Sequence, residues 1–498
     1  MIYCPQYAQR RHSMFFGREN ELRRLDGLWR KSVSSLVTIR GRRRIGKSTL
    51  VYEFARRSGA RFIKLEGLQP KEGVDNDMQL AAFGRQLARQ VKGSRSKPAD
   101  WFDAFSRLEK VLKGKGKIVV LLDEISWMGK YDPGFAGELK YAWDNWFSRR
   151  PRLIVFLCGS VSAWIEKNIV KSKAFVGRPS MNLTLRDLPM DVCVRFWGRN
   201  AGRTATREIL DVLSVTGGVP KYLENIDPSI SADENIRNLC YRPGALLVDE
   251  FEEIFHDSLD ENLSAKKAIL KSLVGGPLVG EEIADKLGVA YNGHVTGNLS
   301  ELEMSGFVAR DSGINPSTGK ETKTCRWRIS DNYTRFYLKY IEPNLALIGK
   351  DAYRFASLDQ LPDWEGVLGL QFECLILNNI DLLLPLIGLD RALLTSAAPY
   401  RQNKTERLKG CQIDLVIQTR KSVYCVEIKR QNSIGEKVVD ECEEKISRLK
   451  VKNTRTVRPV LVYDGDLSRR VPADAFFSFI VSSDDLIGRN AAGSAGGF

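Results

Sequence analysis

The segment that most constrains this chain is GRRRIGKS, Gly41–Ser48, which stands between two apolar stretches. Before it, Leu36–Ile39 is a short apolar and β-branched run that predicts a strand, and after it apolar residues recur at helical spacing from Leu50 to Ala55. A glycine-rich loop between a strand and a helix is the setting of a P-loop, where backbone N–H groups and the amino end of the helix hold phosphate groups. The segment therefore predicts a site for a nucleoside triphosphate.

Each position of this loop has a role in that prediction. Gly41 and Gly46 permit tight turns and let backbone N–H groups approach phosphate oxygens. We expect Lys47 to reach the β- and γ-phosphates and Ser48 to ligate Mg²⁺. The rest of the predicted nucleotide-binding loop comprises Arg42, Arg43, Arg44, Ile45 and Thr49. The three arginines either contact phosphate or point outward to a partner.

A second strand pattern ends in two acids. Ile118–Leu122 is a continuous apolar run, as in a central strand of a parallel sheet, and Asp123 and Glu124 follow it. Ligands of such sheets bind at the carboxyl ends of the strands, so we expect Asp123 to coordinate Mg²⁺ and Glu124 to polarise an attacking water. The two motifs together predict ATP with Mg²⁺ as the cofactor and assign catalytic roles to Lys47 and Glu124.

Two further candidates for the nucleotide site each have a structural alternative. A third strand pattern, Leu153–Leu157, leads to Ser160, which either senses the γ-phosphate or forms a turn. Arg178 either contacts the γ-phosphate of its own or a neighbouring subunit, or is a surface cation. The contact to a neighbouring subunit would require a homo-oligomer.

Five segments in order resemble archaeal-type ATPases of the AAA+/STAND superfamily: FFGRENELRRLDGLW, GRRRIGKSTL, LLDEISWM, LCGS and TGGVPKYL. The resemblance covers about the first half of the chain. It implies that Gly17, Arg18 and Glu19 lie beside the nucleotide and that Ser160 is the first sensor. It also implies a helical lid in which Pro220 lies over the base.

The middle of the chain predicts short helices followed by a β-hairpin. Helical patterns cover Lys266–Leu273, Gly280–Val289 and Tyr291–Met304, and the strand patterns GFVAR and CRWRIS flank a turn at Ser312–Lys320. This is the element order of a winged helix-turn-helix. The third helix holds no Lys or Arg, so the cations for DNA contact would come from the hairpin: Lys320, Lys323, Arg326 and Arg328. A protein-interaction or linker module is the alternative.

The last third of the chain places acids where a metal ion could bind. Trp364–Ile380 predicts a helix with Glu373, the strand IDLVIQ contains Asp414, and the next strand, VYCVEIKR, contains Glu427 and Lys429. Residues two apart in a strand face the same side, and hairpin pairing can bring Asp414 to them. Two carboxylates ~4 Å apart repel by about 4 kcal/mol at an effective dielectric of ~20. A divalent cation reverses that sign, and oxygen ligands suit Mg²⁺ or Mn²⁺.

These residues predict a metal centre of Glu373, Asp414 and Glu427, with Lys429 orienting or helping to deprotonate a metal-bound water. The Asp followed by ExK resembles the PD-(D/E)xK nuclease superfamily, with Ile413 in place of the proline that names the motif. The resemblance implies a restriction-endonuclease-like α/β fold with Glu427 and Lys429 as catalytic residues. The order ATPase, winged helix, nuclease-like domain resembles a group of archaeal-type ATPases over nearly the whole chain.

The predicted fold is α/β throughout, with a P-loop parallel sheet and helical lid before the winged helix and the nuclease-like domain. The expected divisions are a P-loop ATPase core at 1–185, a helical lid at 186–260, a winged helix at 261–342, a linker at 343–360, the nuclease-like domain at 361–488 and a flexible tail at 489–498. The net charge of +15 favours a polyanionic partner, especially nucleic acid, and DNA is the favoured one in the overall interpretation.

Composition narrows the setting further. No apolar run reaches the roughly 18–20 residues that cross a bilayer, and no secretory signal is recognisable, so we expect a cytoplasmic protein without a membrane partner. The nine scattered cysteines predict neither a disulfide framework nor a zinc site. The favoured interpretation is an ATP-controlled DNA enzyme. The alternatives are a signalling switch whose C-terminal domain binds without cutting, and a transcription-factor-like ATPase that uses the winged helix.

Overall fold

The computed structural model describes residues 15–31, 33–90, 96–114, 116–160, 163–259, 262–402, 410–449 and 451–489. Apart from Arg489, the tail predicted at 489–498 lies outside the described residues. The chain forms two compact units: Met1–Arg186 with Ile254–Asp260, and Asp187–Glu253 with Glu261–Phe498. The predicted end of the ATPase core at residue 185 adjoins this boundary. The finer division of the second unit stays a prediction.

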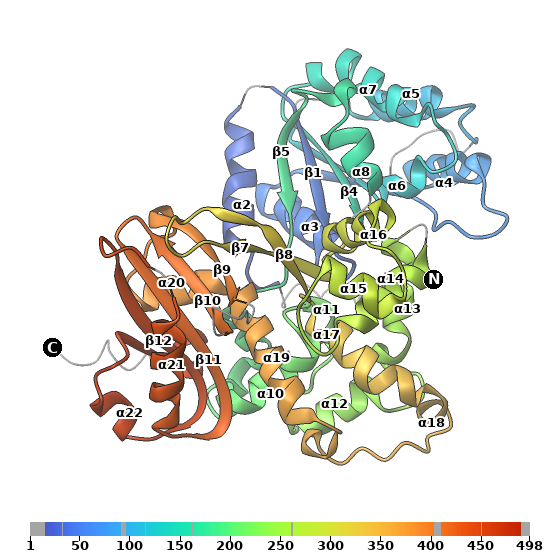
Figure 1. Cartoon of the computed structure of the whole chain (residues 1–498). Coiled ribbons are helices and arrows are strands. Elements are labelled where there is room, and N and C mark those ends of the chain that lie inside the picture. Colours follow the sequence, from blue (N-terminus) through green and yellow to red (C-terminus); the bar gives the residue numbers. More distant parts are fainter. Residues whose placement is uncertain are drawn as a thin grey trace. The chain divides into compact units, whose positions relative to one another are not determined.

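The first unit is built on a parallel sheet of five strands in the order β2-β3-β4-β1-β5 (Figure 1). Every residue of β3 is buried, as its unbroken apolar sequence predicted, because helices cover both faces of the sheet. The strands are β1 (Ser35–Gly41), β2 (Arg61–Glu66), β3 (Ile118–Asp123), β4 (Leu153–Ser160) and β5 (Pro179–Thr184).

Two apolar cores attach the helices of this unit to the sheet. On one face pack α2 (Glu19–Asp26) and α3 (Lys47–Ser58), which follows the P-loop. On the other face pack α4 (Asn76–Gln90), α5 (Trp101–Val111) and α7 (Phe135–Asn145). The parallel direction brings the carboxyl ends of all strands to one edge, where the predicted phosphate and Mg²⁺ residues lie.

The second unit contains a mixed sheet of five strands in the order β13-β12-β11-β10-β9. Strands β9, β10 and β11 pair antiparallel, whereas β11, β12 and β13 pair parallel. The strands are β9 (Leu394–Gln402), β10 (Cys411–Thr419), β11 (Ser422–Ile434), β12 (Thr456–Leu467) and β13 (Phe479–Ser482). Helices α19 (Trp364–Asn378) and α21 (Lys437–Ser447) pack on β11, so the elements predicted for the last third of the chain are present.

The helices and hairpin predicted for the middle of the chain are also present. They are α14 (Leu263–Ser272), α15 (Gly280–Leu287) and α16 (Gly293–Met304), with β6 (Leu278–Val279), β7 (Val308–Ile314) and β8 (Glu321–Ile329) in a sheet of order β6-β8-β7. Helix α15 ends two residues earlier than predicted because Gly288 adopts a left-handed conformation with φ 67°. Helix α16 begins later because the side chain of Asn292 caps it.

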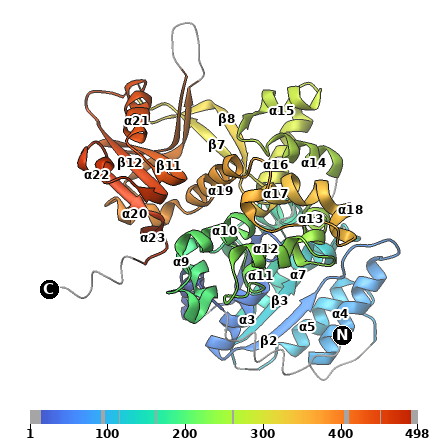
Figure 2. The same ribbon diagram turned by 90° about the horizontal axis from the view of Figure 1, so that it is seen from below.

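The segment before the middle region is helical, as a lid predicts. It includes α10 (Thr206–Thr216), α11 (Pro220–Leu223) and α12 (Ala232–Cys240). Helix α10 packs against α17 (Asn332–Phe336) and α19, and Figure 2 shows these helices together. Among the described residues no single helix is long and apolar enough to cross a bilayer, and the pair formed by α19 and α20 (Ile380–Leu386) meets length and composition criteria only together, across a 74° bend.

Candidate nucleotide site and candidate metal centre

The P-loop has the backbone conformation that its glycines predict. Gly41 has φ 148° and Gly46 has φ 89°, both in the range that side chains disfavour. A Cβ atom on Gly41 would lie 2.5 Å from the carbonyl oxygen of Leu185, so only glycine fits there. Arg44 adopts φ 70°, which a non-glycine residue rarely does. The loop between β1 and α3 is therefore tightly wound, with Lys47 at the first position of the helix.

Lys47 and Ser48 lie where the sequence predicted them. The buried Lys47 donates from Nζ to the carbonyl oxygens of Gly41 at 2.9 Å and Arg42 at 3.1 Å. Its ammonium group is therefore held inside the loop, where a phosphate oxygen would compete with those carbonyls. Ser48 Oγ donates to Asp123 Oδ2 at 2.7 Å, which brings the two predicted Mg²⁺ ligands together.

Lys64 is a residue of this site that the sequence analysis missed. It lies on β2 with Nζ 3.0 Å from Asp123 Oδ2 and 2.9 Å from Glu66 Oε2. Burial acts to lower the pKa of Lys64, but the carboxylates of Asp123 and Glu66 outweigh it and raise the pKa. The role of Lys64 can be recognised only from the pairing of β2 with β3, which places Glu66 beside Asp123.

Glu124 follows β3 in a left-handed conformation, φ 49° and ψ 51°, and caps the short helix α6 (Ile125–Met128). Such a conformation costs of order 1–3 kcal/mol and persists where packing enforces it. Gly67 provides part of that packing: a Cβ there would lie 2.7 Å from the Glu124 carbonyl oxygen. Gly67 was not singled out in the sequence, although a glycine directly after a strand end is a detectable signal.

The FxGRE segment lies beside the P-loop, as the family resemblance implied. Gly17 and Arg18 both have positive φ, 72° and 67°, and Glu19 begins α2. Arg18 Nη2 donates to the carbonyl oxygen of Arg186 at 2.5 Å and lies 3.4 Å from that of Ile45. A guanidinium from the start of the chain is thus anchored on the loop itself.

The remaining candidates for the nucleotide site are Ser160, Arg178 and Pro220. Ser160 is the last residue of β4 and pairs with Gly41 across the parallel ladder. Arg178 makes a bidentate ion pair with Asp144, at 2.7 Å and 2.9 Å, which raises the pKa of Arg178 and lowers that of Asp144. Arg178 would have to leave this pair to reach a phosphate. Pro220 opens α11 in the second unit.

In the second unit, the register of β10 and β11 brings Asp414 and Glu427 together. Leu415 pairs with Val426, so Asp414 and Glu427 stand opposite each other one step further along the two strands. Asp414 Oδ2 accepts a hydrogen bond from the backbone N–H of Ile428 at 2.8 Å. The side chain of Glu427 is 4% exposed, so these carboxylates face a nearly dry environment.

Two lysines contact Glu427. Lys429 Nζ lies 3.0 Å from Glu427 Oε1 and donates to Glu441 at 3.0 Å, as expected for residues on one face of β11. Lys445 on α21 donates to both carboxylate oxygens of Glu427 at 2.6 Å. The sequence analysis missed Lys445, although Val438 and Cys442 mark the buried stripe of α21 from which it extends.

Burial, the charge of Glu427 and the charge of Glu373 together raise the pKa of Asp414 to about 8. The charge of Lys445 acts to lower the pKa of Asp414, but these larger effects oppose it. Burial also raises the pKa of Glu373, against the opposing charges of Arg328 and Arg335. The charge of Glu373 on α19 therefore acts on Asp414, and its role as a metal ligand stays a prediction. No group of three or more His, Cys, Asp or Glu side chains is arranged to hold a metal ion within the described residues.

The expectation that the hairpin cations face DNA is wrong for Arg328. Arg328 is buried, pairs with Asp311 at 3.0 Å, and directs Nη1 toward Cys374 Sγ on α19 at 3.7 Å. It therefore supports the helix of Glu373. Arg326 is also engaged, with Glu282 at 3.1 Å. A strand sequence does not tell which of its cations the neighbouring helix will cover.

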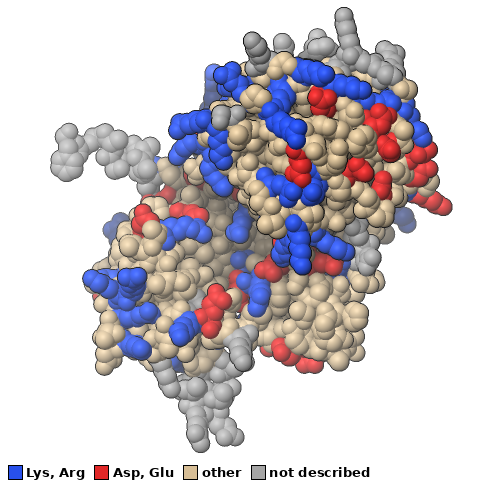
Figure 3. Space-filling model, turned by 90° about the horizontal axis from the view of Figure 1, so that it is seen from above, with Lys and Arg blue, Asp and Glu red and all other residues tan. Residues whose placement is uncertain are grey.

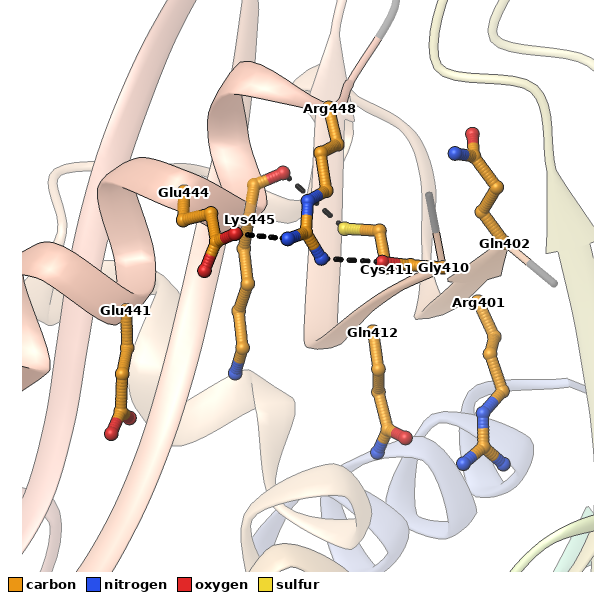
Figure 4. Close-up of a pocket in the computed structure, with 9 residues that line it drawn as sticks. All are labelled: Arg401, Gln402, Gly410, Cys411, Gln412, Glu441, Glu444, Lys445 and Arg448. Carbon is orange, nitrogen blue, oxygen red and sulfur yellow. Dashed lines mark hydrogen bonds and ion pairs between the residues drawn. The ribbon is translucent and has the colours of Figure 1, made fainter. Parts of the chain in front are cut away.

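A pocket of about 440 Å³ adjoins Lys445. Figure 4 shows Arg401, Gln412 and Lys445 extending to the same side of it, whereas Arg448 turns to Glu444. The charge of Arg401 also acts to lower the pKa of Glu373. The pocket is lined by Arg401, Gln402, Gly410, Cys411, Gln412, Glu441, Glu444, Lys445 and Arg448.

The strand that carries Glu427 and Lys429 is tied to the lid by a buried ion network. Arg430, whose side chain is 0% exposed, contacts Asp211 of α10 at 2.5 Å and Asp464 of β12 at 3.0 Å. It also donates to Ser214 Oγ of α10 at 3.0 Å. Breaking a buried pair of this kind typically costs about 3–5 kcal/mol, so α10 and β11 are held together firmly.

Comparison with known proteins finds a similar family for the amino-terminal part of the chain. Residues 15–226 match the model of a family described as an ATPase domain predominantly from Archaea. An uncharacterized protein of Methanocaldococcus jannaschii is 25% identical over 367 residues, covering 72% of this chain and 76% of that protein. The chain is also similar to two solved structures. A Walker-type ATPase of Pyrococcus abyssi gives a TM-score of 0.48 at 17% identity, with 65% of this chain and 96% of that chain covered. The ORC2 protein of Aeropyrum pernix gives 0.41 at 15% identity, with 67% and 94% covered.

The family match and the loop geometry lead to one conclusion. The matched residues contain the P-loop, the acids at the end of β3 and the parallel sheet that carries both. The match and the loop geometry together support a P-loop ATPase domain that binds ATP.

Proposed function

We propose that this protein is an ATP-controlled regulator of a metal-dependent nuclease-like domain that acts on nucleic acid, with DNA as the favoured substrate. The observation that carries the proposal is the pair of Asp414 and Glu427 on adjacent strands β10 and β11, with Lys429 in contact with Glu427 and the charge of Glu373 acting on Asp414. The middle helices and hairpin act as a winged helix-turn-helix that supports this domain through Arg328.

In the ATPase domain, Lys47 binds the β- and γ-phosphates, and Ser48 with Asp123 holds Mg²⁺. Their 2.7 Å hydrogen bond supports a shared ion between them. Glu124 polarises the attacking water. Ser160 senses the γ-phosphate. Arg178 remains a candidate for contact with that phosphate in a homo-oligomer, once released from Asp144.

The carboxylates of the second unit fit a divalent cation by their chemistry. Asp414 and Glu427 supply hard oxygen ligands, and Glu373 lies close enough to raise the pKa of Asp414. A bound Mg²⁺ or Mn²⁺ would lower the pKa of a ligated water and stabilise charge on the scissile phosphate. Lys429 would hold that water in position, and Lys445 would balance charge once Glu427 turns to the cation.

Control by ATP would reach this centre through α10. That helix ends at the GGVP segment, where Pro220 is proposed to lie over the base, and it binds Arg430, the neighbour of Lys429. A movement of the lid on ATP binding would therefore pull on the strand that carries two of the four proposed nuclease residues.

A nuclease assay on duplex DNA, single-stranded DNA and RNA tests this proposal. It compares wild type with Asp414→Ala and Lys47→Ala, in Mg²⁺ or Mn²⁺, with and without ATP. The exposed Asp440→Ala on α21 is the matched control. We expect metal-dependent cleavage that Asp414→Ala abolishes and that loses its response to ATP in Lys47→Ala. A wild type that cuts none of these substrates under any condition would sink the proposal.

A second function is favoured by one observation. Lys429 and Lys445 already neutralise Glu427, so this domain can serve as a binding module in a signalling switch without cutting. Calorimetric titration of the full chain with Mn²⁺ separates the two functions. A nuclease binds the ion, and Asp414→Asn loses that binding. The switch shows no uptake that depends on Asp414, and Lys445→Gln does not restore any.

A further inference from the structure

The first unit has a second edge that the nucleotide site does not use. Its strands run parallel, so the P-loop lies at their carboxyl ends and the opposite edge is where they begin. The segments 30–31, 56–61, 113–117 and 149–152 lead into β1, β2, β3 and β4, and they contain no Asp or Glu. Their described cations form what we call the basic edge: Arg30, Lys31, Arg56, Arg57, Arg61, Lys113, Lys117, Arg149, Arg150 and Arg152.

Backbone contacts join these segments into one surface. The N–H of Arg61 donates to the carbonyl oxygen of Lys117 at 2.9 Å, and the N–H of Ile118 donates to that of Arg152 at 3.0 Å. Ser34 Oγ, at the start of β1, hydrogen-bonds to the carbonyl oxygens of Phe147 and Arg150, just before β4. The amino ends of four adjacent strands are therefore fixed side by side.

The positive charge of the basic edge is poorly compensated. Glu53 pairs with Arg56 and Arg57, at 2.7 Å each. Burial and then the charge of Arg61 lower the pKa of Arg150, which shows two cations in close proximity.

Among the described residues, the charge of two exposed arginines is not neutralised by an ion pair. In the part of the chain that the structure describes, the side chains of Arg149 and Arg152 make no hydrogen bond or ion pair. Figure 3 views the molecule from the side on which the amino ends of these strands lie, and Lys and Arg side chains gather there over much of the first unit.

We propose that the basic edge binds the phosphate backbone of duplex nucleic acid. Four adjacent strands span about 14 Å at ~4.8 Å spacing, and a duplex presents about eight phosphate charges over that length at one per ~1.7 Å. The number of charges on the two surfaces is therefore similar. Arginine predominates, and its planar fork matches phosphate oxygens in a bidentate manner. Because the edge is opposite to the P-loop, a duplex bound there would not compete with ATP.

Fluorescence anisotropy with a labelled random-sequence duplex of roughly 30 base pairs tests this surface, titrated at several salt concentrations. The test variant changes Arg61, Arg149 and Arg152 to Gln, and the matched control changes the exposed Arg203, Arg242 and Arg354 to Gln. ATP hydrolysis without duplex should match wild type in both, since none of these residues belongs to the nucleotide site. This also verifies that the test variant is folded.

At about 0.9 per phosphate contact, loss of three contacts should reduce the salt slope of duplex binding by about 2.7. We expect this in the test variant and a wild-type slope in the control variant. Equal slopes in the two variants would overturn the proposal, as would a wild type that binds vesicles of anionic phosphatidylserine but no duplex. The assay involves no cleavage, so its failure is distinguishable from failure of the proposed nuclease function.

Discussion

In the candidate nucleotide site and the candidate metal centre, the lysine and aspartate side chains have opposite partners. At the edge of the first sheet, Asp123 is satisfied by Ser48 and Lys64, and Lys47 is held by carbonyl oxygens. In the second unit, Lys429 and Lys445 contact Glu427, whereas the charges of Glu427 and Glu373 act on the half-buried Asp414.

The difference shows which site is ready for its ligand. A nucleotide with Mg²⁺ would enter the first site by replacing hydrogen bonds of normal length. A cation would enter the second only after Asp414 loses a proton and Glu427 loses a lysine. The first site is thus preorganised, whereas in the proposed metal centre cation binding would require exchange of a proton and a lysine.

The largest expected effect separates hydrolysis from binding at the first site. Glu124→Gln should slow ATP hydrolysis about 10³-fold, since proton transfer by a positioned carboxylate contributes 10²–10⁴. ATP affinity should remain, because the phosphate contacts are made by the P-loop. Single-turnover hydrolysis and equilibrium ATP binding measure the two quantities. Glu138→Gln on α7 is the control, and equal rates in the two variants would remove Glu124 from its catalytic role.

Lys47→Ala should weaken ATP binding about 100-fold, equivalent to ~3 kcal/mol for a charged hydrogen-bonding group. The ammonium is buried, and no other described lysine is hydrogen-bonded to the carbonyls of Gly41 and Arg42. Calorimetric titration with a non-hydrolysable ATP analogue measures the loss, with the exposed Lys110→Ala as control. Wild-type affinity in Lys47→Ala would refute the phosphate-site assignment.

Cation binding at the second site should respond to pH. Asp414 keeps its proton up to about pH 8, and a cation binds the deprotonated form. Affinity for Mn²⁺ should therefore rise about tenfold per pH unit as pH increases toward 8, and level off above it. Titrations between pH 6 and 9 test this, with Asp414→Asn losing the dependence and Asp440→Asn keeping it. Affinity that is flat across this range would contradict the contrast between the sites.

The smallest effect concerns the packing around Glu124. Gly67→Ala would place a Cβ against the Glu124 carbonyl oxygen, and such overpacking costs about 1–3 kcal/mol. We expect hydrolysis to fall roughly tenfold while ATP binding is kept, because the P-loop is untouched. Gly137→Ala on α7, where a Cβ meets nothing within 4 Å, is the control. Unchanged hydrolysis in Gly67→Ala would mean that the position of Glu124 does not depend on this contact.

Much of this architecture was predictable from local sequence. The P-loop and the strand before Asp123 are defined by glycines and by an unbroken apolar run, and both depend on neighbours in the chain. The same holds for Glu427 and Lys429, whose spacing alone places them on one face of a strand. Where a position is fixed by backbone geometry within a few residues, the sequence predicted the local structure around it.

The rest depended on which distant segments meet. Three cations pair with acids on other elements: Lys64, Lys445 and Arg430. The residues beside them in the sequence do not predict those pairs. The prediction for Arg328 was wrong for the same reason: its strand pattern indicated a surface cation, whereas α19 covers it. The bidentate pair of Arg178 with Asp144 likewise emerged only when α7 and the start of β5 were placed together.

The central claim is that the nucleotide state controls the acid site through the contact between α10 and Arg430. The most direct measurement is the rate of metal-dependent DNA cleavage with ATP divided by the rate without it, for wild type, Asp211→Asn and the exposed control Asp285→Asn. The account predicts a ratio well away from one in wild type and in the control, and a ratio near one in Asp211→Asn, with ATP hydrolysis unchanged in all three. A wild-type ratio of one, or the same ratio in Asp211→Asn as in wild type, would contradict it.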